Sequence, residues 1–174
     1  MSASPYFFIE MKNKDTGEWE RVELFIKNRK GEFEYADVWT WNGTHDLFRK
    51  LGAERGWGEP DKVIRGVHYG LPCDASMPVK KEYSVFKEDN VDAHYVYLSD
   101  IYIDTLQNPT VLDYDAMDEA YERAEEGAVV ENIYCQSPVK TFFDRVCSYI
   151  ECWNDWYEIY SNLSEIRIIY WLSW

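Results

Sequence analysis

Both ends of the chain alternate large side chains in the way that β-strands do, and this pattern constrains the fold more than any other. Residues 5–12 carry aromatic and aliphatic side chains on both sides of the alternation, and residues 18–27 set apolar positions against charged ones. Residues 165–171 alternate again, with Ile166, Ile168 and Tyr170 on one side and Arg167, Ile169 and Trp171 on the other. Successive side chains of a strand point to opposite faces, so all three segments are predicted to be strands.

A polar turn and a long apolar helix arrange these strands into one domain. The turn at residues 13–17 ends in a glycine and predicts a hairpin between the first two strands. Residues 137–160 repeat apolar side chains with helical spacing, and this broad face needs a sheet to cover. We therefore predict a single α+β domain over residues 1–174. One antiparallel sheet, formed by the N-terminal hairpin and the C-terminal strand, has helices packed on one face.

Shorter elements are predicted between the hairpin and the long helix. The patterns place a third strand at 33–41 and a short strand at 93–98. Capping residues, helix breakers and apolar spacing predict helices at residues 44–52, 76–86, 99–107 and 115–126. No internal repeat divides these elements.

The charge of the chain excludes some partners. The net charge is −14, from 32 acidic and 18 basic residues. Nucleic acids and anionic membranes attract cationic patches, so we expect neither as a direct partner. The same charge permits binding to a basic protein surface, although it also serves to keep an aromatic-rich chain in solution.

The cysteine pattern favours a reducing compartment and predicts that the protein has no structural metal site. The four cysteines contain no C-x-x-C pair, and the chain has three histidines, so we expect no zinc site and no other metal. The longest apolar runs fall far short of about 18 residues, so no membrane span is expected. The first residues lack the layout of a signal peptide. Free thiols in the cytoplasm are the natural expectation.

A turn-rich middle region combines aromatic and basic residues. The aromatic residues are Trp39, Trp41, Trp57 and Tyr69, and the basic residues are Arg49, Arg55, Lys62 and Arg65. Aromatic rings stack on bases and arginine pairs with phosphate, which would suit a nucleotide-like small ligand. Core packing of the aromatics and a solvated basic face explain the same residues.

The segment from Gly70 to Ser76 has a structural and a functional interpretation. Pro72 favours a turn, Asp74 is expected to bond the backbone two residues on, and Ser76 is expected to cap the next helix. A helix start with free N–H groups also binds anions.

His94 and Asp74 are candidates for an acid–base pair, with Cys73 as a nucleophile. Imidazole titrates near neutral pH and a carboxylate orients it, which is the chemistry of a small hydrolase. No spacing of a known nucleophile surrounds these residues, and a backbone hydrogen bond explains His94 equally.

An acidic segment follows. Its carboxylates are Asp113, Asp115, Asp118, Glu119, Glu122, Glu125 and Glu126. Spaced carboxylates on a helix resemble the phosphates of DNA and would fit a basic groove, although most acidic helix faces are only solvated.

A string of short motifs resembles a widespread group of small bacteriophage proteins. The motifs are Trp41-Asn42 with His45-Asp46-Leu47-Phe48, Gly70-Leu-Pro-Cys-Asp-Ala-Ser76, Asp92-Ala-His94 with Tyr97-Leu98-Ser99, and the C-terminal Ile-Arg-Ile-Ile-Tyr-Trp strand. The resemblance implies phage or prophage origin and a host bacterial cytoplasm. It implies no activity.

Three hypotheses follow for the function. The first is a phage counter-defence protein that sequesters a nucleotide-derived host immune signal without catalysis, metal or cofactor. Its ligand-binding residues would be Trp39, Trp41, Asp46, Arg65, His68, Tyr69, Asp74, Ser76 and His94. The second is an acidic inhibitor, of the anti-CRISPR or DNA-mimic type, that binds a host defence protein. The third is a small hydrolase that uses Asp74 and His94. A homo-oligomer is compatible with each.

Overall fold

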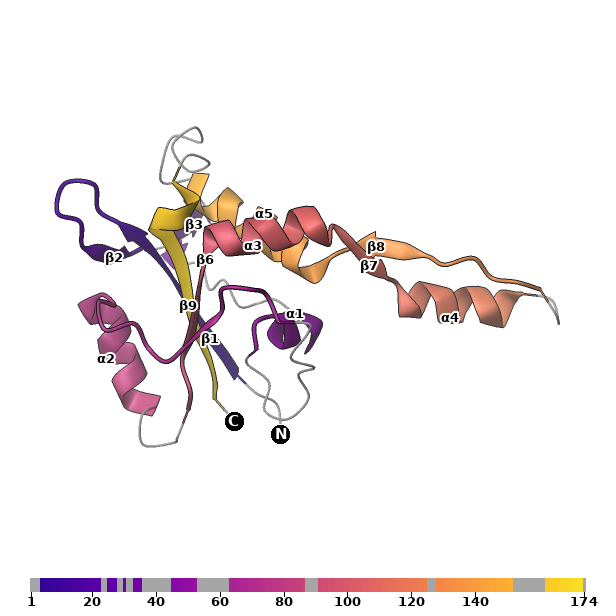
Figure 1. Ribbon diagram of the computed structural model, residues 1–174, viewed down its shortest axis with the longest axis horizontal. Helices are drawn as coiled ribbons and strands as arrows, with labels where there is room; N and C mark the ends of the chain where they lie inside the picture. The colour runs from indigo at the N-terminus through magenta and orange to yellow at the C-terminus, as the bar shows by residue number, and fades with distance from the viewer. Residues whose placement is uncertain are drawn as a thin grey trace.

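A five-stranded antiparallel sheet forms the centre of the protein (Figure 1). The computed structural model describes residues 4–22, 25–27, 30, 33–35, 45–52, 63–86, 91–124, 128–151 and 162–173. The strands follow the order β2 (Trp19–Arg21), β1 (Ser4–Lys12), β9 (Ile166–Ser173), β6 (His94–Tyr97) and β5 (His68–Tyr69). Helices pack on this sheet, so the predicted α+β class is confirmed.

The C-terminal strand β9 lies in the middle of the sheet. It pairs antiparallel with β1 from Ser4 opposite Ser173 to Met11 opposite Ile166, and with β6 on its other side. All of its residues but the last are buried. The prediction that the C-terminal segment joins the sheet of the N-terminal hairpin is therefore confirmed, and the structure identifies β1 as its partner there.

Helices cover both faces of the sheet, so the prediction of helices on one face is wrong. Helices α1 (His45–Lys50), α3 (Leu98–Gln107) and α5 (Pro138–Glu151) pack on one face. Helix α2 (Met77–Phe86) packs on the other (Figure 1). The cause is that β1 and β9 carry large apolar side chains on both sides, and each side must be removed from water.

The two faces bury different parts of the same strands. The face under α1, α3 and α5 buries Phe7, Ile9 and Ile168. The face under α2 buries Phe8, Ile169 and Trp171. We call the second the α2 face.

Residues 18–27 do not form one strand, contrary to prediction. Strand β2 ends at Arg21, and Phe25–Lys27 forms β3, which pairs with β4 (Phe33–Tyr35) in a separate two-stranded sheet. The apolar positions Trp19 and Val22 are three residues apart, and this spacing breaks the period of two that a continuous strand requires.

Other predictions hold over the described residues. Helices α2, α3 and α5 start within one residue of the predicted positions. The rest of the third predicted strand, beyond Tyr35, and of the long predicted helix, beyond Glu151, lies outside the described residues.

An arm extends from this body (Figure 1). It consists of β7 (Thr110–Leu112), α4 (Tyr114–Arg123) and β8 (Tyr134–Gln136), with β7 and β8 paired as a two-stranded ribbon. Helix α4 confirms the predicted acidic helix as far as Arg123. Among the described helices none combines the length and the apolar character needed to cross a membrane.

Candidate functional site

Two buried charges meet at the centre of the sheet. Glu10 on β1 lies directly opposite Arg167 on β9, and the two side chains are 0% and 1% exposed. The Arg167 Nε–H donates to Glu10 Oε2 at 2.8 Å, and Arg167 Nη2 lies 2.7 Å from the same oxygen. Buried charges are costly unless they are paired, so each of these residues depends on the other.

This ion pair holds the segment that leads into α2. The Arg167 Nη1–H donates to Asp74 Oδ1 at 2.7 Å, and Glu10 Oε1 accepts the Ser76 backbone N–H at 2.7 Å. The ring of Trp19 lies over the guanidinium, with its centroid 4.0 Å from Arg167 Cζ. A cation over an indole face is attracted electrostatically. Side chains of β1 and β9 therefore hold the start of α2 against the sheet.

The same network lowers the pKa of Asp74, whose side chain is 58% exposed. Partial burial by itself would raise the pKa of Asp74. The hydrogen bond and the positive charge of Arg167 act in the opposite direction and hold the pKa below its ordinary value.

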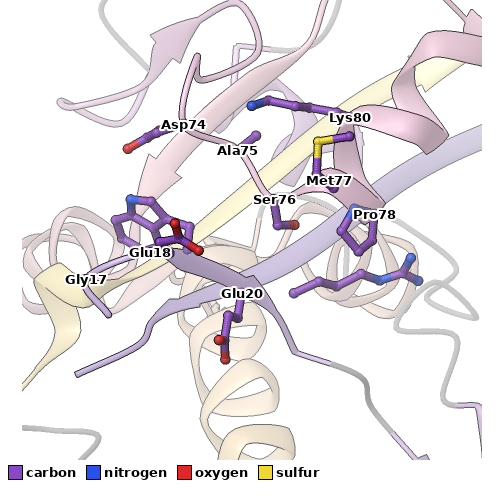
Figure 2. Close-up of a pocket in the computed structure, with 11 residues that line it drawn as sticks. Gly17, Glu18, Glu20, Asp74, Ala75, Ser76, Met77, Pro78 and Lys80 are labelled. Atoms are coloured by element: carbon purple, nitrogen blue, oxygen red, sulfur yellow. The ribbon is translucent and has the colours of Figure 1, made fainter. Parts of the chain in front are cut away.

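A groove of about 800 Å³ adjoins this network, because Trp19, Asp74 and Ser76 line it (Figure 2). The β1–β2 hairpin forms one side through Glu18, Glu20 and Arg21. The start of α2 forms the other side through Asp74, Ser76, Met77, Pro78 and Lys80.

The hairpin wall is shaped by its own turn. Asn13 Oδ1 accepts the N–H groups of Asp15 and Thr16, and Gly17 adopts a φ of 72°, which favours glycine. This turn places Gly17 and Glu18 at the rim of the groove.

The lining of the groove carries both signs of charge. Lys80 and Arg21 supply cations, which favour an anion. The Lys80 ammonium forms no ion pair with any residue that the structure describes. Glu18, Glu20 and Asp74 supply acceptors, and the Ser76 hydroxyl is buried without a hydrogen-bond partner among the described residues. The groove thus suits a ligand that combines an anionic group with hydrogen-bond donors.

Aromatic rings continue the α2 face beyond the network. His68 stacks on Tyr95 with centroids 4.6 Å apart, and Tyr97 meets the His68 ring edge-on at 6.0 Å. Tyr95 lies opposite Ile169 and Tyr97 opposite Arg167, so these rings share the face of the buried arginine. Burial, and secondarily the neighbouring Tyr97, raise the pKa of Tyr95.

His94 lies on the opposite face of the sheet. It pairs with Tyr170 across β6 and β9, and the two rings stack 5.6 Å apart. The imidazole is buried, its Nδ1 has no hydrogen-bond partner among the described residues, and burial lowers its pKa despite the opposing effect of Asp92. Tyr69 meets His94 edge-on at 5.0 Å and is itself exposed.

The predicted ligand-binding residues are thus divided between two faces. His68, Asp74 and Ser76 belong to the α2 face, and Tyr69 and His94 to the other. Arg65 is exposed in the turn before β5. The remaining three predicted site residues fall outside the described part: Trp39, Trp41 and the side chain of Asp46.

The division of faces also separates the acid–base pair that the hydrolase hypothesis needs. Asp74 contacts Arg167, while His94 stacks on Tyr170, three residues further along β9 and therefore on the opposite side of the strand. The sheet lies between the two groups. Cys73 is exposed in the turn next to Asp74.

The local roles predicted for Asp74 and Ser76 are wrong in detail. The Ser76 N–H is taken by Glu10, and Asp74 pairs with Arg167 rather than with the backbone two residues on. The Ser76 hydroxyl does not cap α2. A long-range carboxylate replaces both local interactions, since Glu10 had to be satisfied within the sheet.

Sequence reasoning missed the two residues that organise the site. Glu10 and Arg167 are charged residues at inward positions of strands that are otherwise apolar. Two opposite charges at such positions of predicted neighbouring strands are the signal that would have found the pair.

The comparisons with known proteins leave the site to be judged on its geometry. No family model, curated protein or solved structure matches this chain. The phage origin that the short motifs imply therefore stays a prediction. Within the described residues no group of three or more His, Cys, Asp or Glu side chains is placed to hold a metal ion.

Proposed function

We propose that this chain is a non-enzymatic binding protein that captures a nucleotide-like small molecule in the groove between the β1–β2 hairpin and the start of α2. The observation that carries the proposal is that Lys80, which forms no ion pair with described residues, and the ionised Asp74 both line a groove of about 800 Å³. Pockets for small ligands commonly span about 300–1,000 Å³.

Each wall of the groove has a role in this proposal. Lys80 binds the phosphate, and Arg21 supplies a second cation to the lining of the groove. Asp74 accepts hydrogen bonds from N–H or O–H groups of the base or sugar. The buried ion pairs of Arg167 hold these groups in place before the ligand arrives, which reduces the ordering cost of binding.

We further propose that the ligand is a nucleotide-derived immune signal and that the protein is a phage counter-defence protein acting in the bacterial cytoplasm. The motif resemblance supports the phage setting. The separation of Asp74 from His94 favours capture over hydrolysis, because the pair proposed for hydrolysis is split by the sheet.

The proposal is tested by calorimetric titration of the purified protein with a panel of cyclic mononucleotides and cyclic dinucleotides. We expect one class to bind and to be released intact on heating, as read by mass spectrometry. Lys80→Ala removes a charge-assisted hydrogen bond, commonly worth about 1.5–3 kcal/mol, so the affinity should fall at least about tenfold.

Lys81→Ala is the matched control, because Lys81 is exposed on the same helix and does not line the groove. Equal losses from both variants would place the effect in the general charge of α2. Recovery of a cleaved nucleotide would contradict the proposal of non-enzymatic capture and would show that the protein is a catalyst.

A further inference from the structure

The arm presents aromatic side chains that the chain itself does not cover. Helix α4 buries none of its residues. Tyr114 is 68% exposed, Tyr121 54% and Tyr134 on β8 58%. Burying a tyrosine side chain contributes strongly to the binding free energy of an interface. Tyrosine is also more frequent in interfaces than on the rest of the protein surface.

The exposed aromatics of α4 lie on one stripe. Tyr114, the half-buried Met117 and Tyr121 are spaced three and four residues apart, and residues so spaced lie on the same face of a helix. This spacing is the one that amphipathic helices use to insert into a groove of a partner.

Carboxylates lie along one side of the stripe. Asp115, Asp118 and Glu122 follow the neighbouring positions around the helix. The described residues of the arm, 108–124 and 128–136, hold six carboxylates and one guanidinium. That guanidinium, Arg123, bonds Glu119 at 3.0 Å. The exposed charge beside the tyrosines is therefore strongly negative.

The arm is built as a defined element. The Asp113 carboxylate caps α4 by accepting the Ala116 N–H at 3.0 Å, and the Asp113 N–H donates to the Ile133 carbonyl at 2.9 Å. At its base the Ser137 N–H donates to the Pro109 carbonyl at 3.0 Å. A helix held in this way binds with a smaller entropic cost than one that must fold on its partner.

We propose that the arm is a docking element that inserts the Tyr114–Met117–Tyr121 stripe into an apolar groove of another protein whose rim carries Lys and Arg. Charge complementarity selects this occupant. An anionic membrane and a nucleic acid repel the carboxylates, and a second copy of the chain brings another net charge of −14. The proposal concerns a different surface from the groove and does not depend on it.

The experiment uses the full chain with a photo-crosslinking phenylalanine analogue in place of Tyr114. The control carries the analogue in place of Val85, which is 69% exposed on α2. Each variant is irradiated in a bacterial extract, and the captured protein is identified, purified and titrated against the unmodified chain. We expect capture from position 114 only, with crosslinks to a Lys- and Arg-rich surface.

Variants then test the chemistry of the contact. Tyr121→Ala removes an aromatic anchor, and hot-spot losses of about 2 kcal/mol correspond to roughly 30-fold weaker binding. The double variant Asp118→Lys/Glu122→Lys should weaken binding and remove most of its salt dependence. Asp15→Lys, a reversal at an exposed carboxylate of the hairpin turn, is the control for a charge change outside the arm and should change little.

Several results would overturn the proposal. They are the absence of a crosslink from position 114, equal capture from position 85, a crosslink between two copies of this chain, and an affinity that ignores the charge reversal. Thermal unfolding of each variant checks that the body is intact, which is expected because α4 buries no residue.

Discussion

The body and the arm are both made of antiparallel strands and helices, yet they differ in what they bury. In the body, β9 is buried on both sides and a salt bridge with 0% and 1% exposed side chains lies within the sheet. In the arm, α4 buries nothing and its tyrosines face solvent. The difference indicates that most of the stabilising burial is in the body. The side chains of α4 in the arm remain accessible for contacts with another molecule.

The largest expected effect tests the buried charges of the body. Arg167→Met leaves the Glu10 carboxylate buried without its partner, and such a change commonly costs about 3–5 kcal/mol of unfolding free energy. The double variant Glu10→Leu/Arg167→Met removes both charges and should recover most of this loss. Urea denaturation gives the unfolding free energy of the unmodified chain, the single variant and the double variant. A single variant as stable as the double would show that Glu10 does not depend on Arg167.

A smaller effect is expected at the buried hydroxyl of Tyr170. Its O–H donates to the Leu51 carbonyl at 2.6 Å and joins β9 to the end of α1. Tyr170→Phe keeps the ring and leaves that carbonyl unsatisfied, so the unfolding free energy should fall by about 1–3 kcal/mol. Hydrogen exchange of the Leu51 and Gly52 amides should rise in the variant. Unchanged stability would mean that water replaces the hydroxyl.

The pH dependence of the body should report His94. Burial lowers its pKa below the ordinary 6.5, so the unfolded chain takes up a proton before the folded protein does. Stability should therefore fall as the pH drops below about 6.5, by at most about 1.4 kcal/mol per pH unit, until the lower pKa of the folded state is reached. Unfolding free energies between pH 8 and 5 measure the slope. His94→Phe keeps a ring against Tyr170 and should flatten it; an identical slope in the variant would assign the dependence to other groups.

The smallest effect is expected in the arm. Tyr114→Ala and Tyr121→Ala remove exposed rings, and surface changes of this kind usually alter stability by less than about 0.5 kcal/mol. Thermal and urea unfolding of both variants test this. A loss comparable with that at Tyr170 would break the contrast, because it would show that the arm rings support the body.

Much of the fold was predictable because its signals are local. The alternation in residues 165–171, the Gly52 that ends α1 at a φ of 68°, and the Pro138 that begins α5 each depend on neighbouring residues only. The candidate site was less predictable. Asp74 and His94 both stand in turn-rich sequence, and nothing local shows that β9 would place them on opposite faces.

The sequence by itself determined most of the strands and helices, that the C-terminal strand joins the sheet of the N-terminal hairpin, and that α4 is acidic, since periodicity and charge are properties of the chain. Only the tertiary structure decided that Glu10 meets Arg167, that Asp74 and Ser76 are held by them, and that α2 covers the second face. The register between strands 157 residues apart sets these contacts, and register is chosen by the packing of the whole sheet rather than by any segment of it.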